Sequence, residues 1–262
     1  EAPAAEGEAA AEGGLATLQR LLMVTGGDAG TYYALGGVLA NVLTESVNNL
    51  EITATTSGAS AANARSLNNG EAELAILQND VLGYAYEGID SMAEDGAMPK
   101  LRAIAGMYPE VIQLVALKSS NINTIADLKG KTVAYSSGTS SEDILKNTLA
   151  SAGMTMDDIT AMDMDASAIV TAMISGGVDA CATWSPNTLA ILDQMEGTTK
   201  LSDNMTFSDT TISLASWIAT PKYLEENRDV AVRFVRALFK AMDYAADGNY
   251  EEIAQLVANQ TK

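Results

Sequence analysis

Short apolar runs alternate with segments of helical periodicity along most of the chain, beginning near residue 19. In the periodic segments, apolar residues recur every three or four positions, as they do on the buried face of an α-helix. The short runs predict strands at 20–24, 51–55, 74–78, 102–107, 112–117, 132–135, 178–183 and 214–219. Strands that alternate with helices are typical of an α/β fold with largely parallel sheets. The last part of the chain, at 225–246 and 250–258, has helical periodicity throughout.

The alternating elements fall into two halves, which predict two lobes joined by a double-crossover hinge. We expect the first lobe to comprise residues 19–111 and 213–262, and the second residues 118–210. The chain would cross between the lobes near 112–117 and again near 211–214. Two lobes joined in this way form a cleft that can close over a small ligand. Residues 1–18 begin with an acidic stretch of low complexity, which predicts a disordered tether.

Three loops of small residues each lead from a predicted strand into a predicted helix. The N–H groups at the start of a helix have no partner within the helix, and the helix dipole favours negative charge there. The loops therefore predict one anion held by main chain from several sides. Their candidate ligand-binding residues are Thr25, Gly26, Gly27, Asp28, Gly30, Thr31, Tyr32, Ser57, Gly58, Ala59, Ser60, Ser136, Ser137, Gly138, Thr139 and Ser140.

Within this set we expect the anionic end of the ligand to lie against residues 137–140, with residues 57–60 facing it. The hydroxyl groups of Thr25, Ser57 and Ser140 could donate to the same anion. Each of these side chains could instead cap a helix, and the pattern leaves that alternative open.

Five further residues lie next to these loops in the predicted cleft: Gln78, Asp80, Tyr108, Trp184 and Asn187. Asp80, like Asp28 in the first loop, could pair with a ligand ammonium group or could cap a helix. Trp184 follows a strand of the second lobe and could either stack on the ligand or pack between the lobes. Trp217 lies inside a predicted strand and is expected to be a core residue.

Composition limits the chemistry that the chain can perform. The formal net charge is −19, from 34 acidic and 15 basic residues, which argues against a nucleic-acid partner. The chain has no histidine and one cysteine, Cys181, which excludes Ser–His and Cys–His catalytic arrangements and the usual zinc ligand sets. Lysine or carboxylate chemistry stays open, but no motif for it is present. We therefore expect a binding protein without catalytic residues, metal or cofactor.

Two stretches resemble known receptor families of one fold. Residues 21–133 resemble the TAXI receptors of tripartite (TRAP) transporters, and residues 127–245 resemble the nitrate, taurine and sulfonate (NMT1-like) receptors of ABC importers. The first likeness rests on Thr25-Gly-Gly-x-x-Gly-x-Tyr32, Ser57-Gly-Ala-Ser60, Leu67–Leu74, Gln78-Asn-Asp80, Tyr108-Pro-Glu110 and Ile125–Val133. The second rests on Asp127-Leu-Lys-Gly-Lys131, Trp184-Ser-Pro-Asn187 and Ser216–Leu224. Both families share the type II periplasmic-binding-protein fold.

The resemblance implies a monomeric, non-enzymatic receptor outside the cytoplasm, in the periplasm or at the cell surface. It would bind a small organic anion or zwitterion, such as an amino acid, a sulfonate or a carboxylate, and deliver it to membrane permease subunits. An ABC importer is the favoured partner, and a tripartite transporter or a ligand sensor is the alternative. We expect any export signal to have been removed, with a lipid anchor as one use of the tether. An enzyme is disfavoured because Gly26-Gly-x-x-Gly30 is not followed by the Lys-Ser/Thr of a phosphate-binding loop.

Overall fold

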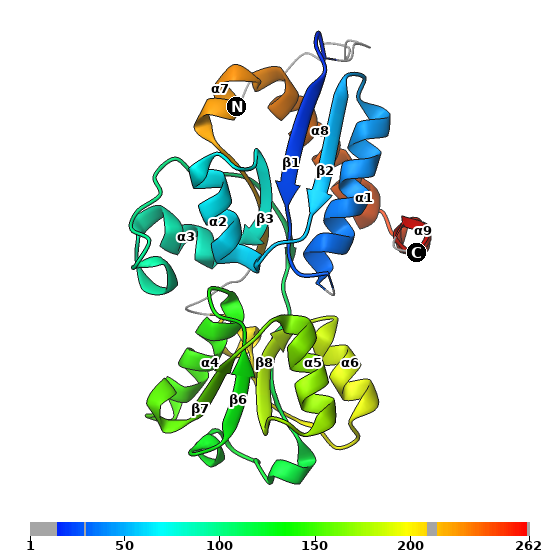
Figure 1. The fold of residues 1–262 in the computed structure, drawn as a ribbon. Coiled ribbons are helices and arrows are strands. Elements are labelled where there is room, and N and C mark those ends of the chain that lie inside the picture. Colours follow the sequence, from blue (N-terminus) through cyan, green and yellow to red (C-terminus); the bar gives the residue numbers. More distant parts are fainter. Residues whose placement is uncertain (1–14, 29, 209–213, 261–262) are drawn as a thin grey trace, which may run out of the picture.

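The chain folds into two lobes, each built on a five-stranded sheet with helices packed on it (Figure 1). The computed structural model describes residues 15–28, 30–208 and 214–260. One sheet has the strand order β2-β1-β3-β10-β4 and the other β7-β6-β8-β5-β9. The first lobe therefore takes strands from both ends of the chain, whereas the second is formed by its middle. This is the two-lobed type II periplasmic-binding-protein fold that the sequence predicted.

The first lobe is built from segments on either side of the second lobe in sequence. Its strands are β1 (Gln19–Val24), β2 (Leu50–Thr55), β3 (Leu74–Gln78), β4 (Arg102–Pro109) and β10 (Leu214–Ala219). Its helices are α1 (Thr31–Ser46), α2 (Ala59–Asn69), α3 (Asn79–Glu87), the short η1 (Asp90–Met92), α7 (Pro221–Glu226), α8 (Arg228–Ala246) and α9 (Tyr250–Gln260).

The second lobe is continuous in sequence. Its strands are β5 (Ile112–Ala116), β6 (Thr132–Tyr135), β7 (Thr160–Asp163), β8 (Ala180–Trp184) and β9 (Thr199–Asp203). Its α-helices are α4 (Ser140–Ser151), α5 (Ala166–Ser175) and α6 (Asn187–Gln194). Short 3-10 helices η2 (Lys118–Ser120), η3 (Ile125–Leu128), η4 (Met156–Asp158) and η5 (Asn204–Phe207) lie in its connections.

All eight predicted strands are present, but the prediction of largely parallel sheets needs correction. Strand β10 runs antiparallel to both β3 and β4, and β5 runs antiparallel to both β8 and β9. Each sheet thus contains one reversed strand, placed between strands that run the other way. Two edge strands, β7 and β9, were not predicted because Thr-Ala-Met-Asp and Thr-Lys-Leu-Ser-Asp contain no continuous apolar run.

The first crossing between the lobes lies earlier than expected. Residues 112–117 were predicted as hinge, but β5 occupies Ile112–Ala116 in the second sheet, so the chain crosses at Glu110 and Val111. The second crossing was predicted at 211–214. Residues 211–213 lie outside the described part of the chain, and β10 begins at Leu214.

The folded first lobe also begins earlier than expected, within the segment 1–18 that was predicted to be a tether. Residues 1–14 lie outside the described part of the chain. Leu15 is buried in the core of the first lobe, and its backbone N–H donates to the Asn48 carbonyl at 2.8 Å. The folded lobe therefore includes residues that the sequence assigned to the tether, because Leu15 packs in the core and its backbone N–H and carbonyl are both hydrogen-bonded to the loop before β2.

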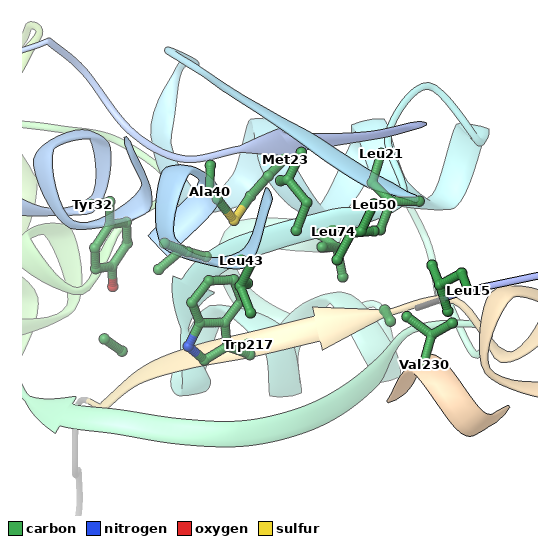
Figure 2. Close-up of a cluster of buried hydrophobic side chains, with 14 residues drawn as sticks. Leu15, Leu21, Met23, Tyr32, Ala40, Leu43, Leu50, Leu74, Trp217 and Val230 are labelled. Carbon is green, nitrogen blue, oxygen red and sulfur yellow. The ribbon is translucent and has the colours of Figure 1, made fainter. Parts of the chain in front are cut away.

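An apolar cluster in the first lobe holds its sheet against α1 and α8 (Figure 2). Trp217 of β10 is fully buried there, as predicted, and its ring meets that of Phe234 edge-to-face at 5.0 Å. In Figure 2 the cluster runs from Leu15 and Val230 at one end to Tyr32 at the other. Tyr32 also lines the cleft between the lobes, so this core directly supports one wall of the cleft.

Candidate functional site

The cleft between the lobes contains three adjoining cavities, and all three are lined by Gly30 and Trp184. The first, here called the polar chamber, has a volume of about 400 Å³ and lies between the loops 27–30 and 57–59 of the first lobe and 136–139 and 163–167 of the second. The second, the aromatic chamber, has a volume of about 510 Å³ and is lined by Tyr32, Tyr108 and Glu110 among others. A small cavity of about 20 Å³ reaches Gln78.

Most of the residues predicted to bind ligand line these cavities. They are Gly26, Gly27, Asp28, Gly30, Thr31, Tyr32, Ser57, Gly58, Ala59, Ser60, Gln78, Tyr108, Ser136, Ser137, Thr139 and Trp184. Five do not. Thr25 is buried and donates its hydroxyl to the Thr55 carbonyl at 2.6 Å, and Asn187 is buried at the start of α6. Asp80, Gly138 and Ser140 lie where the two lobes touch each other.

The start of α4, where we expected the anionic end of the ligand, is already bonded to side chains of the protein. The Ser137 N–H donates to Asp163 Oδ1 at 2.8 Å, and the Gly138 N–H donates to Glu142 Oε2 at 2.8 Å. The Ser140 N–H donates to Gln78 Oε1 at 2.9 Å. Three of the N–H groups in the segment 137–140 are thus already used within the protein, and an anion there would have to displace two carboxylates and an amide.

The starts of α1 and α2 have no N-cap side chain, although the first turn of α2 already donates from Ala59 N–H to Ser57 Oγ at 3.3 Å and from Ala61 N–H to the Gly138 carbonyl at 3.2 Å. Gly30 precedes α1 and Gly58 precedes α2, neither residue has a side chain to cap its helix, and neither helix has an acidic residue in its first turn. Both starts line the polar chamber. Ala59, which begins α2, has a φ of +67°, a strained conformation for a residue other than glycine. The positive ends of two helix dipoles therefore lie at this chamber on the side of the first lobe.

The lining of the cleft is acidic. Among the described residues that line it are four carboxylates, Asp28, Glu110, Asp163 and Asp165, and neither lysine nor arginine. Three of them are exposed, whereas Glu110 is only 6% exposed and accepts a hydrogen bond from Gln78 Nε2 at 2.7 Å. A ligand bound here would meet negative side chains together with the positive ends of helices.

The two lobes contact each other directly beside the cleft. The contacts are Ser140 Oγ to Asp80 Oδ2 at 2.5 Å, Ser140 N–H to Gln78 Oε1 at 2.9 Å, Ala61 N–H to the Gly138 carbonyl at 3.2 Å, Thr31 Oγ1 to the Ser185 carbonyl at 3.1 Å, and Lys146 Nζ to Asp90 Oδ1 at 3.5 Å. They join the first lobe to α4 and to the loop after β8. The structure therefore shows the lobes closed against each other.

One of these contact regions contains a buried carboxylate with a shifted pKa. Asp143 on α4 is 5% exposed, and burial, followed by the charges of Asp80 and Asp90, raises its pKa to about 7. Burial likewise raises the pKa of Asp80 on the opposite lobe, although the hydrogen bond from Ser140 opposes this. Asp143 Oδ2 has no hydrogen-bond partner among the described residues.

Residues 23–226 match the NMT1-like family. The chain belongs to this family. A protein of Brucella abortus named only as a binding protein is 28% identical over 204 residues, which are 77% of this chain and 62% of that protein. The chain thus spans less than two thirds of the curated relatives that it matches first.

Solved structures show the same fold. The alkanesulfonate-binding protein SsuA of Xanthomonas axonopodis, bound to MOPS, superimposes with a TM-score of 0.67 at 20% identity over 94% of this chain and 84% of that one. The periplasmic aliphatic sulphonate-binding protein SsuA of Escherichia coli superimposes with a TM-score of 0.66 at 25% identity over 93% and 79%. None of the helices in the described residues is long and apolar enough to span a membrane.

Two groups of lining residues were not predicted. The loop from Asp163 to Ser167 joins β7 to α5, and Glu110, Val111, Ser185, Pro186 and Leu189 line the aromatic chamber. The Asp163–Ser167 loop is another small-residue connection from a strand to a helix. It was missed because β7 is short and polar and was not recognised as a strand.

Proposed function

We propose that this chain is an extracytoplasmic receptor that captures a small organic solute with an anionic group between its lobes and delivers it to an ABC importer. The observation that carries the proposal is the cleft itself, in which the N-terminal ends of α1 and α2 line a chamber of about 400 Å³. Sulfonate-binding proteins of the same fold support an anionic ligand. Binding and release need no catalytic group, and the proposal is for a non-enzymatic protein.

The anionic group would lie against the N–H groups at the starts of α1 and α2 rather than at α4. A direct hydrogen bond to such an N–H is short-ranged and little screened, whereas salt screens the net charge of −19 beyond roughly 8 Å. Local geometry can therefore attract an anion into a protein that repels anions at long range. A tripartite transporter, as for TAXI receptors, is the alternative partner.

A thermal-shift screen tests the receptor function. Protein that has been unfolded, dialysed and refolded would be screened against alkanesulfonates, taurine, amino acids and mono- and dicarboxylates. A ligand that binds only the folded state adds RT ln(1 + [L]/Kd), which is about 4 kcal/mol at a thousandfold excess over Kd. A clear shift with one anionic class is the expected result. Turnover of the bound compound, or no shift with any anion, would contradict the proposal.

Replacing Trp184 by alanine should weaken binding of the solute found in that screen about tenfold, which is roughly 1.4 kcal/mol. Trp184 lines all three cavities, so its ring contributes apolar contact wherever in the cleft the ligand lies. Isothermal titration calorimetry gives the affinity, and Trp184→Phe, which keeps an aromatic ring, should retain most of it. Unchanged affinity in a folded Trp184→Ala protein would assign the ring to packing between the lobes.

A further inference from the structure

The aromatic chamber contains a carboxylate that is held deep between the lobes. Glu110 lies at the first crossing of the chain, between β4 and β5, and lines both this chamber and the small cavity below it. Gln78 Nε2 donates to its Oε2, and Asn204 Nδ2 holds its backbone carbonyl at 2.7 Å. The side chain is therefore fixed in position. At 6% exposure its negative charge is poorly screened by solvent.

Aromatic side chains surround this carboxylate. Tyr32, Tyr108 and Trp184 line the same chamber, and the faces of aromatic rings attract cations. Burial and then the charge of Glu110 raise the pKa of Tyr32 and of Tyr108, which places both phenols within the field of the carboxylate.

Tyr32 lies next to this carboxylate. Its side chain is 8% exposed and lines the chamber, and burial, the charge of Glu110 and a side-chain hydrogen bond to Glu110 all raise its pKa. Tyr32 and Gln78 therefore both hold the Glu110 carboxylate at the wall of the chamber.

We propose that the aromatic chamber binds an ammonium-type group of the ligand, with Glu110 as its counter-charge and Tyr32, Tyr108 and Trp184 around it. The inference rests on the proposed function and narrows it to a zwitterion, whose anionic end lies at the starts of α1 and α2 and whose cationic end lies here. Gly30 and Trp184 line both chambers, so one small molecule can reach both. Glu110 replaces Asp28 and Asp80 as the partner of the ammonium group, because Asp28 is exposed and Asp80 is engaged by Ser140.

Two pairs of probes that differ by an amine test the proposal by calorimetry: taurine with ethanesulfonate, and β-alanine with propionate. In the wild-type protein we expect the amine-bearing member of at least one pair to bind at least about tenfold more tightly. Glu110→Gln keeps the shape and an oxygen acceptor but removes the charge. It should bring the ratio of the two affinities within each pair close to one, and this ratio, rather than either affinity alone, is the readout.

Asp157→Asn on η4 is the control, because it makes the same change of charge at an exposed position outside the cleft. Equal binding of both members of each pair to the wild type, or an unchanged preference in Glu110→Gln, would overturn the ammonium subsite while leaving the receptor function intact. If none of the four probes binds, and the anions of the thermal-shift screen also fail, the proposed function fails with it. If Glu110→Gln does not fold, the wild-type ratio within each pair decides.

Discussion

Asp143→Asn should be more stable than the wild type by about 2–4 kcal/mol at pH 8 and nearly equal to it at pH 4. The carboxyl of Asp143 has a pKa of about 7 in the folded protein, against about 3.9 in an unfolded chain. Below pH 4 both states are protonated and the buried group costs nothing. As the pH rises from 4 to 7 the unfolded chain ionises first, so the stability of the wild type falls across this window.

The groups that face Asp143 explain why the free-energy cost of ionising its carboxyl depends on lobe closure. Asp80 and Asp90 belong to the first lobe and raise its pKa, while Glu142 on α4 adds to their effect and Lys146 opposes it. Tyr84 of the first lobe lies close enough that the charge of Asp143 contributes to its raised pKa. Moving the lobes apart would relieve the repulsion between Asp143 and the two aspartates. Low pH should therefore favour the closed form, and asparagine at 143 should weaken that dependence.

Urea unfolding at pH 4.5, 6 and 8 measures the effect, with Asp157→Asn as the control for the loss of one exposed negative charge. The difference between Asp143→Asn and wild type should grow with pH, whereas the control should show no such trend. A difference that is the same at all three pH values would mean that Asp143 is ionised throughout or is not buried.

Gly138→Ala should lower ligand affinity about a hundredfold, or roughly 2.7 kcal/mol, without any contact to the ligand. Gly138 has a φ of +65°, and a Cβ at this position would lie 2.6 Å from the Cβ of Ala61 on the opposite lobe. Carbon atoms prefer a separation of about 3.5–4.0 Å. The lobes could not close as far as they do here, where the Ala61 N–H donates to the Gly138 carbonyl at 3.2 Å.

The chain provides matched controls for this prediction. Gly153 follows α4 in the same lobe with a φ of +70°, and a Cβ there would meet nothing within 4 Å. Gly153→Ala therefore carries the same backbone strain without the clash and should keep its affinity. The double variant Ala61→Gly/Gly138→Ala removes the clashing methyl group and should recover much of the loss. Small-angle scattering would report a wider ligand-bound form in Gly138→Ala, and full closure in that variant would refute the argument.

Much of the fold was predictable from local patterns. Strands β3, β6 and β10 match their predicted bounds, since each is a mainly apolar segment with a clear boundary. Gly70 and Gly176 follow α2 and α5 in the left-handed conformation, which is the common use of a glycine just after a helix. The small-residue loops also proved to line the cleft, because a loop between a strand and a helix lies at the edge of its sheet.

The partners of the N–H groups at α4 were not predictable in the same way. Glycine and serine residues before a helix indicate available donors, but they do not show which acceptors reach them. Asp163 comes from a strand that has no apolar pattern, and Gln78 comes from the other lobe. Only the tertiary structure brings these side chains to the start of α4, and this is why we propose the anion site at α1 and α2 instead.

The sequence by itself therefore determined the two-lobed α/β fold, the positions of its main strands along the chain and the loops that form the cleft, because hydrophobic periodicity and turn residues act over a few neighbouring positions. The tertiary structure decided the reversed strands, the position of the crossing at Glu110 and the closeness of Asp80 to Asp143. These features depend on residues tens of positions apart, whose burial and charge interactions exist only once both lobes have formed and met.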